Sequence, residues 1–283
     1  MLPVCFIHLP KTAGSSLQRV LAFNTMPQHV VTIYSNDMNY ATMLLRRKMG
    51  TEIRELETVT PTLIIGHIGF GLLDPFGMSG TYLTLMREPI SRCISEYNFA
   101  KENTHHHLHQ TIHQENISLL DYFRLYPKWH TNLQARMLGG NSGGMLDSTI
   151  SYDRMVASAL INLDRISVFG IQERFADFLV SLSSMFPHFF IWNERINEGK
   201  YTFREALADD EARELEELNR ADMELYKIVA ERFEERVAQI INAEEIRDLI
   251  QKRTRLIESA RELRLEIVPS LAKEQENEGE GAS

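Results

Sequence analysis

Several features that define familiar protein classes are missing from this sequence. Its 283 residues include only two cysteines, Cys5 and Cys93, which are too few for a disulfide scaffold and whose apolar neighbours favour buried, reduced thiols. No apolar run is long enough to span a membrane, because the longest, 63–73, is about half the required length and contains His67. A basic and then apolar leader does not follow Met1, so we expect a cytoplasmic protein without a membrane span.

An excess of positive charge is also absent. The net charge is −9, and it comes entirely from the C-terminal part of the chain. Residues 1–193 carry 15 basic and 15 acidic side chains, whereas residues 194–283 carry 15 and 24. Proteins that bind nucleic acids need a basic surface to contact the phosphates. The charge distribution therefore argues against a nucleic-acid partner.

Short apolar segments alternate with amphipathic ones over the first two thirds of the chain. Strands are predicted at residues 2–8, 62–66, 81–86 and 167–171. Helices are predicted directly after Ser16 and at residues 39–49, 89–99 and 152–163. Such alternation is typical of βαβ units, so we expect an α/β fold with a parallel sheet flanked by helices.

The C-terminal part has a different pattern. From Asp209 onward, apolar residues recur every three or four positions, which predicts continuous helix ending before Pro269. We therefore divide the chain into a main domain at 1–208, helices at 209–268 that pack on that domain, and a disordered acidic tail at 269–283. A homodimer formed through the C-terminal helices is the alternative.

Small and polar residues follow the first predicted strand, in the segment Pro10-Lys11-Thr12-Ala13-Gly14-Ser15-Ser16. A helix that begins here offers unpaired N–H groups and a positive dipole end, which together bind anions. Lys11 adds a charge, Gly14 permits a close approach of the backbone, and the hydroxyls of Thr12, Ser15 and Ser16 add donors. We expect residues 11–16 to bind a phosphate, and an ordinary strand-to-helix turn with a serine cap is the alternative.

This segment is not a Walker A motif. Lys11 precedes Gly14 instead of following a glycine, and the order Gly-x-x-x-x-Gly-Lys-Ser/Thr does not occur in the chain. A nucleotide kinase or NTPase is therefore disfavoured, although it remains an alternative.

A second motif follows the strand predicted at 81–86. Arg87 lies at the carboxyl end of that strand, the edge where open α/β sheets bind ligands. Pro89 suits the first turn of the next helix, and Ser95 lies two turns further along it. A guanidinium and a hydroxyl form a good cradle for a terminal phosphate, so we expect Arg87 and Ser95 to bind the same group.

Together, the two motifs resemble the 5′-phosphosulfate and 3′-phosphate loops of sulfotransferases that use 3′-phosphoadenosine 5′-phosphosulfate. The resemblance is to the carbohydrate branch, which includes heparan sulfate 2-O-sulfotransferase and its bacterial relatives. The family forms are Pro-Lys-Thr-Ala/Gly-small-Ser/Thr, here 10–16, and Arg-Asp/Glu-Pro-x-x-Arg-x-x-Ser-x-Tyr, here 87–97. Weaker similarity follows at 66–72, 132–136 and 170–175.

The resemblance implies a P-loop-like parallel sheet, 3′-phosphoadenosine 5′-phosphosulfate as co-substrate and no required metal. The implied reaction is transfer of a sulfuryl group to an acceptor hydroxyl, on a carbohydrate or another hydroxylated molecule. In-line transfer needs positive charge near the oxygens that gain charge, and Lys11 is the candidate for this role. A non-catalytic nucleotide-binding protein is a further alternative.

The acceptor hydroxyl also needs a base. His67 follows the strand at 62–66, so it should lie on the same rim as Lys11 and Arg87, and imidazole titrates near neutral pH. The resemblance likewise implies His67 as the catalytic histidine. Lesser candidates are Glu88, His8 and His130.

Two other groups of polar residues fall between these motifs and the C-terminal helices. Asn132, Gln134 and Arg136 lie on one predicted helix, either in contact with acceptor or nucleotide or on a solvated surface. The histidine-rich segment between Thr104 and Ile117 is expected to be an exposed loop that faces the acceptor. It includes His105, His106, His107, His109 and His113, without the Cys, Asp or Glu that would complete a metal site.

Overall fold

A computed structural model describes residues 2–34, 63–74, 79–140, 150–194 and 207–262. Five strands form one parallel sheet in the order β2-β3-β1-β4-β5. They are β1 (Val4–Ile7), β2 (Val30–Ile33), β3 (Leu63–Gly66), β4 (Thr81–Met86) and β5 (Val168–Ile171). The prediction of an α/β fold with a parallel sheet is confirmed.

The central strands are apolar on both faces because helices cover both sides of the sheet. All four residues of β1, β3 and β5 are buried, as expected for parallel strands that do not face water. Ile7 pairs with Gly66 on one side and with Thr84 on the other, so β1, β3 and β4 end at one edge. A Cβ atom at Gly66 would lie 1.7 Å from the Ile33 carbonyl oxygen, so only glycine fits there.

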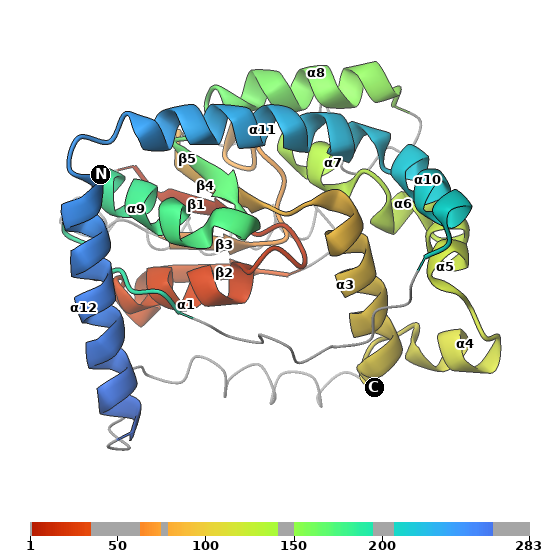
Figure 1. The fold of residues 1–283 in the computed structure, drawn as a ribbon, viewed down its shortest axis with the longest axis horizontal. Coiled ribbons are helices and arrows are strands. Elements are labelled where there is room, and N and C mark those ends of the chain that lie inside the picture. Colours follow the sequence, from red (N-terminus) through yellow and green to blue (C-terminus); the bar gives the residue numbers. More distant parts are fainter. Residues whose placement is uncertain (1, 35–62, 75–78, 141–149, 195–206, 263–283) are drawn as a thin grey trace.

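Helices surround the sheet (Figure 1). They are α1 (Gly14–Phe23), α3 (Pro89–Glu102), α4 (His109–Gln114), α5 (Leu119–Leu125), α6 (Pro127–His130), α7 (Leu133–Gly139), α8 (Tyr152–Leu163), α9 (Phe175–Met185), α10 (Asp209–Leu218), α11 (Arg220–Ala238) and α12 (Ala243–Glu262). Two short 3₁₀ turns, η1 (Pro27–His29) and η4 (Gln172–Arg174), precede β2 and α9.

The structure divides the predicted C-terminal helix into three. The chain turns at Asn219, between α10 and α11, and again at 239–242, before α12. Strand β2 was not predicted, because its short apolar run is interrupted by the exposed Thr32. The helix predicted at 39–49 and the tail at 269–283 lie outside the described residues.

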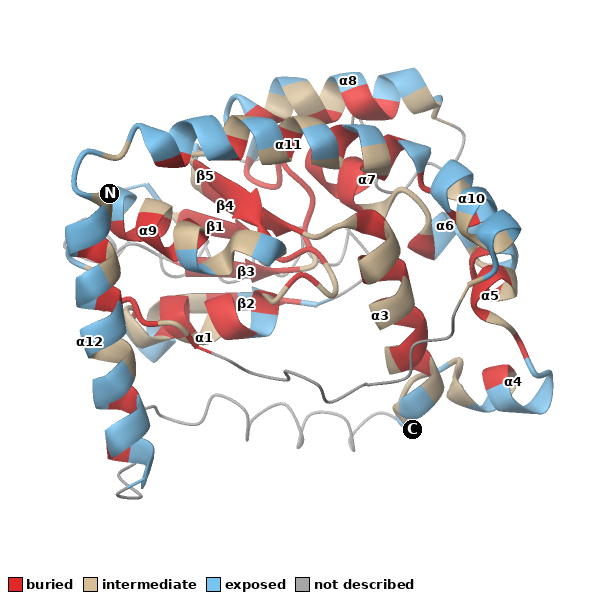
Figure 2. Ribbon diagram, in the orientation of Figure 1, coloured by how far each residue is buried: buried red, intermediate tan, exposed pale blue. Residues whose placement is uncertain are grey.

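The main core lies between the sheet and its helices. Val229 and Phe233 of α11 are buried in the same hydrophobic cluster as the residues of β5, so α11 packs directly on the sheet domain. Figure 2 shows the sheet buried, while the outer sides of α8, α11 and α12 are exposed. A second cluster joins α3, α4, α5 and α10, and includes Tyr97, Ile112 and Leu215.

Two buried helix ends hold α7 and α11 together. The Asn132 amide oxygen accepts hydrogen bonds from the N–H groups of Ala221 (2.8 Å) and Asp222 (3.3 Å), at the start of α11. The Asp222 carboxylate accepts in return from the N–H groups of Gln134 (3.2 Å) and Ala135 (2.7 Å), at the start of α7. Each helix therefore caps the other, which satisfies donors that burial would otherwise leave unpaired.

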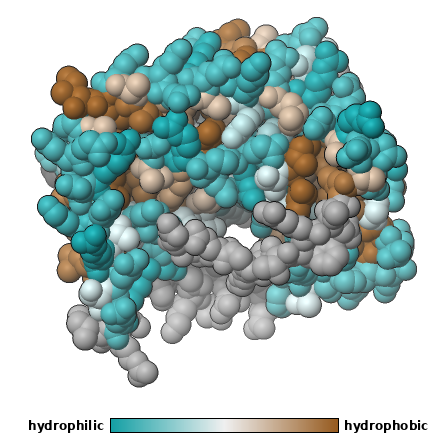
Figure 3. Space-filling view, in the orientation of Figure 1, coloured by the Kyte–Doolittle hydropathy of each residue, from teal (hydrophilic) through white to brown (hydrophobic). Residues whose placement is uncertain are grey.

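The described surface is mostly hydrophilic (Figure 3). An apolar group of atoms lies over the C-terminal end of α11, near the exposed Ile241. None of the described helices combines the length and apolar composition needed to cross a membrane.

Replacement of Asp222 tests the paired caps. Asp222 is fully buried, and burial raises the pKa of its carboxyl while the nearby Arg92 guanidinium opposes this rise. We expect Asp222→Ala to lower the free energy of unfolding by about 3–5 kcal/mol, because it removes two capping bonds to buried N–H groups and a carboxylate near the buried Arg92 guanidinium. Urea denaturation measures this loss. Glu214→Gln, which breaks an exposed pair with Arg124, is the control and should change stability little; equal effects would contradict the prediction.

Candidate functional site

The candidate site lies where three strands end. His8 follows β1, His67 follows β3 and Arg87 follows β4, and the pairing of these strands brings all three positions to one edge. From β1 the chain leads toward β2 on one side of the sheet, whereas β4 leads toward β5 on the other. Open α/β sheets bind ligands at the carboxyl edge, where the connections diverge in this way.

The loop after β1 has an unusual backbone. Lys11 and Ala13 both adopt left-handed conformations, with φ of 69° and 61°. A left-handed conformation at a non-glycine residue lowers the stability of the fold by on the order of 1 kcal/mol. Turns that contain such residues can direct several backbone N–H groups toward one anion. The Thr12 hydroxyl donates to the Leu9 carbonyl at 2.8 Å and so braces the loop, while its role as a cofactor-binding residue stays a prediction. Helix α1 begins directly afterwards, at Gly14.

Two predicted donors lie in the first turn of α1. Ser15 is exposed, whereas Ser16 is buried. The Ser16 N–H donates to the Ala13 carbonyl at 3.1 Å, which tightens this turn. The side of the turn that meets solvent is therefore the one that carries Ser15.

The loops after β1 and β4 are joined directly. The Arg87 guanidinium donates through Nη1 to the Lys11 carbonyl oxygen at 3.1 Å. The Lys11 ammonium lies 4.1 Å from the ring centre of Phe99, on α3, where the ring face attracts a cation. Burial lowers the pKa of Lys11, and the carboxylate of Glu96 opposes this shift. The structure thus brings the two predicted anion-binding loops together.

The backbone at Arg87 is held by side chains from distant parts of the chain. The Gln134 amide accepts from the Arg87 N–H at 3.0 Å and donates to the Arg87 carbonyl at 2.9 Å. The Glu173 carboxylate accepts from the Glu88 N–H at 2.9 Å and from the Tyr226 hydroxyl at 3.0 Å. Burial lowers the pKa of Arg87, while Glu173 and Glu88 raise it.

Helix α3 begins immediately after these residues. The Glu88 carboxylate accepts from the N–H groups of Ile90 and Ser91, at 2.9 and 2.7 Å, so it serves as the cap of α3. This role occupies both oxygens of a side chain that was a lesser candidate for the base. Ser95 is partly exposed on α3, one turn before Phe99.

His8 explains the glycine at position 14. A Cβ atom on Gly14 would lie 1.9 Å from two atoms of the His8 ring, so the imidazole occupies the space that a side chain would need. The Tyr34 hydroxyl donates to the Gln18 amide oxygen at 2.5 Å and therefore accepts from His8 Nδ1 at 3.0 Å. Burial lowers the pKa of His8 to about 3, with His67 and Lys11 adding to the shift.

His67, the favoured base, lies beside this group. Its ring meets the His8 ring edge to face, with centres 5.1 Å apart, and the Tyr34 ring at 4.9 Å. The side chain is only partly buried, and burial lowers its pKa to about 4. The imidazole is therefore neutral at pH 7 and able to accept a proton, but a pKa this low makes it a weaker base than the sequence led us to expect.

His130, another lesser candidate for the base, packs among aromatic side chains. It is buried against the rings of Tyr122 and Phe123, and burial lowers its pKa to about 3, although Glu96 lies 3.7 Å away. The Arg92 guanidinium, also fully buried, donates to the His130 carbonyl at 2.8 Å. These residues connect α3 to α6.

Two alternatives were open for residues 132–136, contact with acceptor or nucleotide and a solvated surface. Gln134 and Arg136 are buried, so this segment does not form a solvated surface. Asn132 caps α11, and Arg136 donates to the Lys128 carbonyl at 2.5 Å. Gln134 contacts a predicted site residue, Arg87.

The histidine-rich segment is only partly a loop. Residues 109–114 form α4, because Ile112 packs into the second cluster. His106 packs edge to face on Phe99 at 5.7 Å, and burial lowers its pKa to about 4, with a contribution from Lys11. This part of the segment therefore approaches Lys11. Within the described ranges, no three His, Cys, Asp or Glu side chains gather in an arrangement that could hold a metal.

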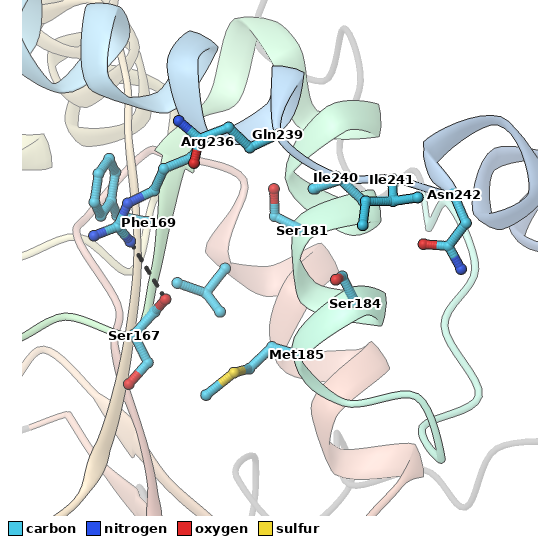
Figure 4. Close-up of a pocket in the computed structure, with 11 residues that line it drawn as sticks. Ser167, Phe169, Ser181, Ser184, Met185, Arg236, Gln239, Ile240, Ile241 and Asn242 are labelled. Carbon is cyan, nitrogen blue, oxygen red and sulfur yellow. Dashed lines mark hydrogen bonds between the residues drawn. The ribbon is translucent and has the colours of Figure 1, made fainter.

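A groove at the other edge of the sheet does not belong to this site (Figure 4). It lies where β5 begins, among residues of α9 and the end of α11, including Ser181 and Ile241. The Arg236 guanidinium lies 4.2 Å from the ring centre of Phe169 and donates to the Ser167 carbonyl at 3.5 Å. The candidate site is at the opposite, carboxyl ends of the strands.

Comparison of the sequence with models of known protein families and with curated proteins finds no match in either case. The functional assignment therefore depends on the two motifs and on the geometry of the loops that contain them.

The contact between His8 and Gly14 predicts a coupled pair of substitutions. Gly14→Ala places a methyl group in the His8 ring, so we expect a loss of about 1–3 kcal/mol in the free energy of unfolding. In a His8→Ala background, the same substitution should cost much less. Thermal or urea unfolding of the four proteins in the cycle measures the coupling, and additive effects would contradict the contact.

The buried neutral histidines should make the free energy of unfolding depend on pH. Because folding lowers the pKa of His8, His67 and His130 to about 3 or 4, the unfolded chain binds protons first. Stability is therefore complete above about pH 6.5 and falls as the pH drops toward 4, by about 1.4 kcal/mol per histidine at pH 5.5. Urea titrations at pH 7.5 and 5.5 measure the loss. His130→Gln should reduce the difference between the two values, and an unchanged difference would contradict the assignment.

Proposed function

We propose that this protein is a sulfotransferase that moves a sulfuryl group from 3′-phosphoadenosine 5′-phosphosulfate to an acceptor hydroxyl. The hydrogen bond between the Arg87 guanidinium and the Lys11 carbonyl carries the proposal. Two motifs that are 76 residues apart, and that each resemble a nucleotide loop of these enzymes, meet at one edge of the sheet. One nucleotide can therefore contact both.

The two loops suit different phosphates of that nucleotide. The loop at 11–16 offers the N–H groups of a left-handed turn, the start of α1 and the Lys11 ammonium, which suit the 5′-phosphosulfate. Arg87 and Ser95 suit the 3′-phosphate, since a guanidinium donates two parallel hydrogen bonds to phosphate oxygens. The hydrogen bond to the Lys11 carbonyl uses only one of the five N–H donors of the Arg87 guanidinium.

Lys11 and His67 supply the chemistry. In-line transfer builds negative charge on the bridging oxygen of the leaving nucleotide, and the Lys11 ammonium stabilises that charge. His67, neutral at pH 7, accepts the proton of the acceptor hydroxyl as its oxygen bonds to sulfur. His8 is less suited to this step because its Nδ1 bonds to Tyr34 and its far edge lies against Gly14.

The acceptor is a hydroxylated molecule without strong negative charge. Residues 1–193 carry no net charge, which gives no electrostatic support for a polyanion. His106, the histidine that approaches Lys11, is neutral at pH 7 because burial lowers its pKa to about 4. A carbohydrate hydroxyl satisfies these conditions.

Nucleotide binding tests the proposal. We expect the protein to bind 3′-phosphoadenosine 5′-phosphate more tightly than ADP, because only the former has a phosphate for Arg87. Arg87→Ala should weaken binding of the former by about 10- to 100-fold, the worth of hydrogen bonds to a charged group. Isothermal titration calorimetry measures both affinities.

Arg165→Ala is the matched control, since it removes the same charge just before β5, at the other edge of the sheet. Its nucleotide affinities should stay unchanged. Equal binding of the two nucleotides, or a preference for ADP that requires magnesium, would contradict the proposal and favour a kinase or NTPase. Tight binding without sulfuryl transfer from the labelled donor would favour a non-catalytic nucleotide-binding protein.

A further inference from the structure

Gln134 forms hydrogen bonds with both backbone polar groups of Arg87, a residue of the candidate site. It is fully buried on α7, and its amide bonds both to the N–H and to the carbonyl of Arg87, at 3.0 and 2.9 Å. These are the two bonds that a residue on a neighbouring strand would make. The amide therefore holds the backbone of Arg87 in place at the point where β4 has ended.

A second layer of contacts fixes Gln134 itself. Its N–H donates to the carboxylate of Asp222 at 3.2 Å, and the N–H of Ala135 donates to the same carboxylate at 2.7 Å. Asp222 belongs to α11, which packs against β5, and the buried guanidinium of Arg92 lies near its carboxylate. The position of Gln134 is thus set by the main core.

The position of the Arg87 backbone sets the direction in which its side chain points. A bidentate guanidinium contact needs good alignment, and small displacements of a positioning group cost large factors in function. Both polar groups of the Arg87 backbone bond to Gln134, so rotation of this residue would break two buried hydrogen bonds. The guanidinium is then held where it bonds to the Lys11 carbonyl.

We propose that Gln134 is a positioning residue for recognition of the 3′-phosphate, acting through the backbone of Arg87. This inference depends on the function proposed above. It assigns to α7 a role in nucleotide specificity, because the amide decides where the guanidinium meets the phosphate. Gln134 reaches the loop assigned to the 5′-phosphosulfate only indirectly, through the bond from Arg87 to the Lys11 carbonyl.

The test compares 3′-phosphoadenosine 5′-phosphate with adenosine 5′-phosphate, which differ only in the 3′-phosphate. Gln134→Met keeps the approximate shape of the side chain and removes both hydrogen bonds. We expect it to reduce the ratio of the two affinities by about 10-fold, with little change for adenosine 5′-phosphate. Calorimetry with the full chain gives both constants, and Gln134→Asn, which keeps the amide but draws it back from Arg87 by one methylene, should also reduce the ratio.

Asn162→Ala is the matched control. The Asn162 amide donates to the carbonyls of Leu138 and Gly139, at the other end of α7, at 2.9 and 3.1 Å. This substitution loosens the same helix without contact to Arg87, so the affinity ratio should stay at its original value.

The outcomes separate the inference from the function on which it depends. If the unsubstituted protein binds the two nucleotides equally, the role of Gln134 and the proposed function are both wrong. A clear preference for the 3′-phosphate that persists in Gln134→Met, or that Asn162→Ala reduces equally, would overturn only the role of Gln134. If Gln134→Met does not fold, the ratio in Gln134→Asn decides: an unchanged ratio would overturn the role.

Discussion

The hydrogen bond from the Arg87 guanidinium to the Lys11 carbonyl depends on the alignment of two parallel strands. β1 and β4 pair with Ile7 opposite Thr84, so the chain leaves both strands at one edge of the sheet. Lys11 and Arg87 each follow within a few residues, which limits how far apart the two loops can lie. Helices α1 and α3 begin directly after the loops, so their N-terminal ends face the same region.

Buried polar groups hold this arrangement in place. Gln134, Asp222 and Asn132 are polar side chains in positions where burial would penalise an unpaired group by about 1–3 kcal/mol. Each bonds instead to backbone groups of a distant segment, so a change in the packing of α7 against α11 would break several bonds together. The apolar core supplies the attraction between these elements, and the polar contacts select one alignment.

Predictions from the sequence were most accurate where one local pattern decided the result. The strands at 62–66 and 81–86 and the helix at 152–163 agree with the structure closely, because apolar runs and helical periods are local signals. β2 was missed although β3 and β5 are equally short, because its short apolar run is interrupted by the exposed Thr32. Helix α4 was predicted as a loop, since its polar residues hide the single buried Ile112.

By itself, the sequence determined the α/β class and the places of the motifs at 10–16 and 87–97 after separate strands, because strand ends and helix starts have local chemical signatures. It did not reveal that Gln134 bonds to Arg87, or that His8 takes the space beside Gly14. Only the tertiary structure decided these contacts. Gln134 and Arg87 are 47 residues apart, and the path of the chain through the core, which no local pattern encodes, sets which distant side chain reaches a given backbone group.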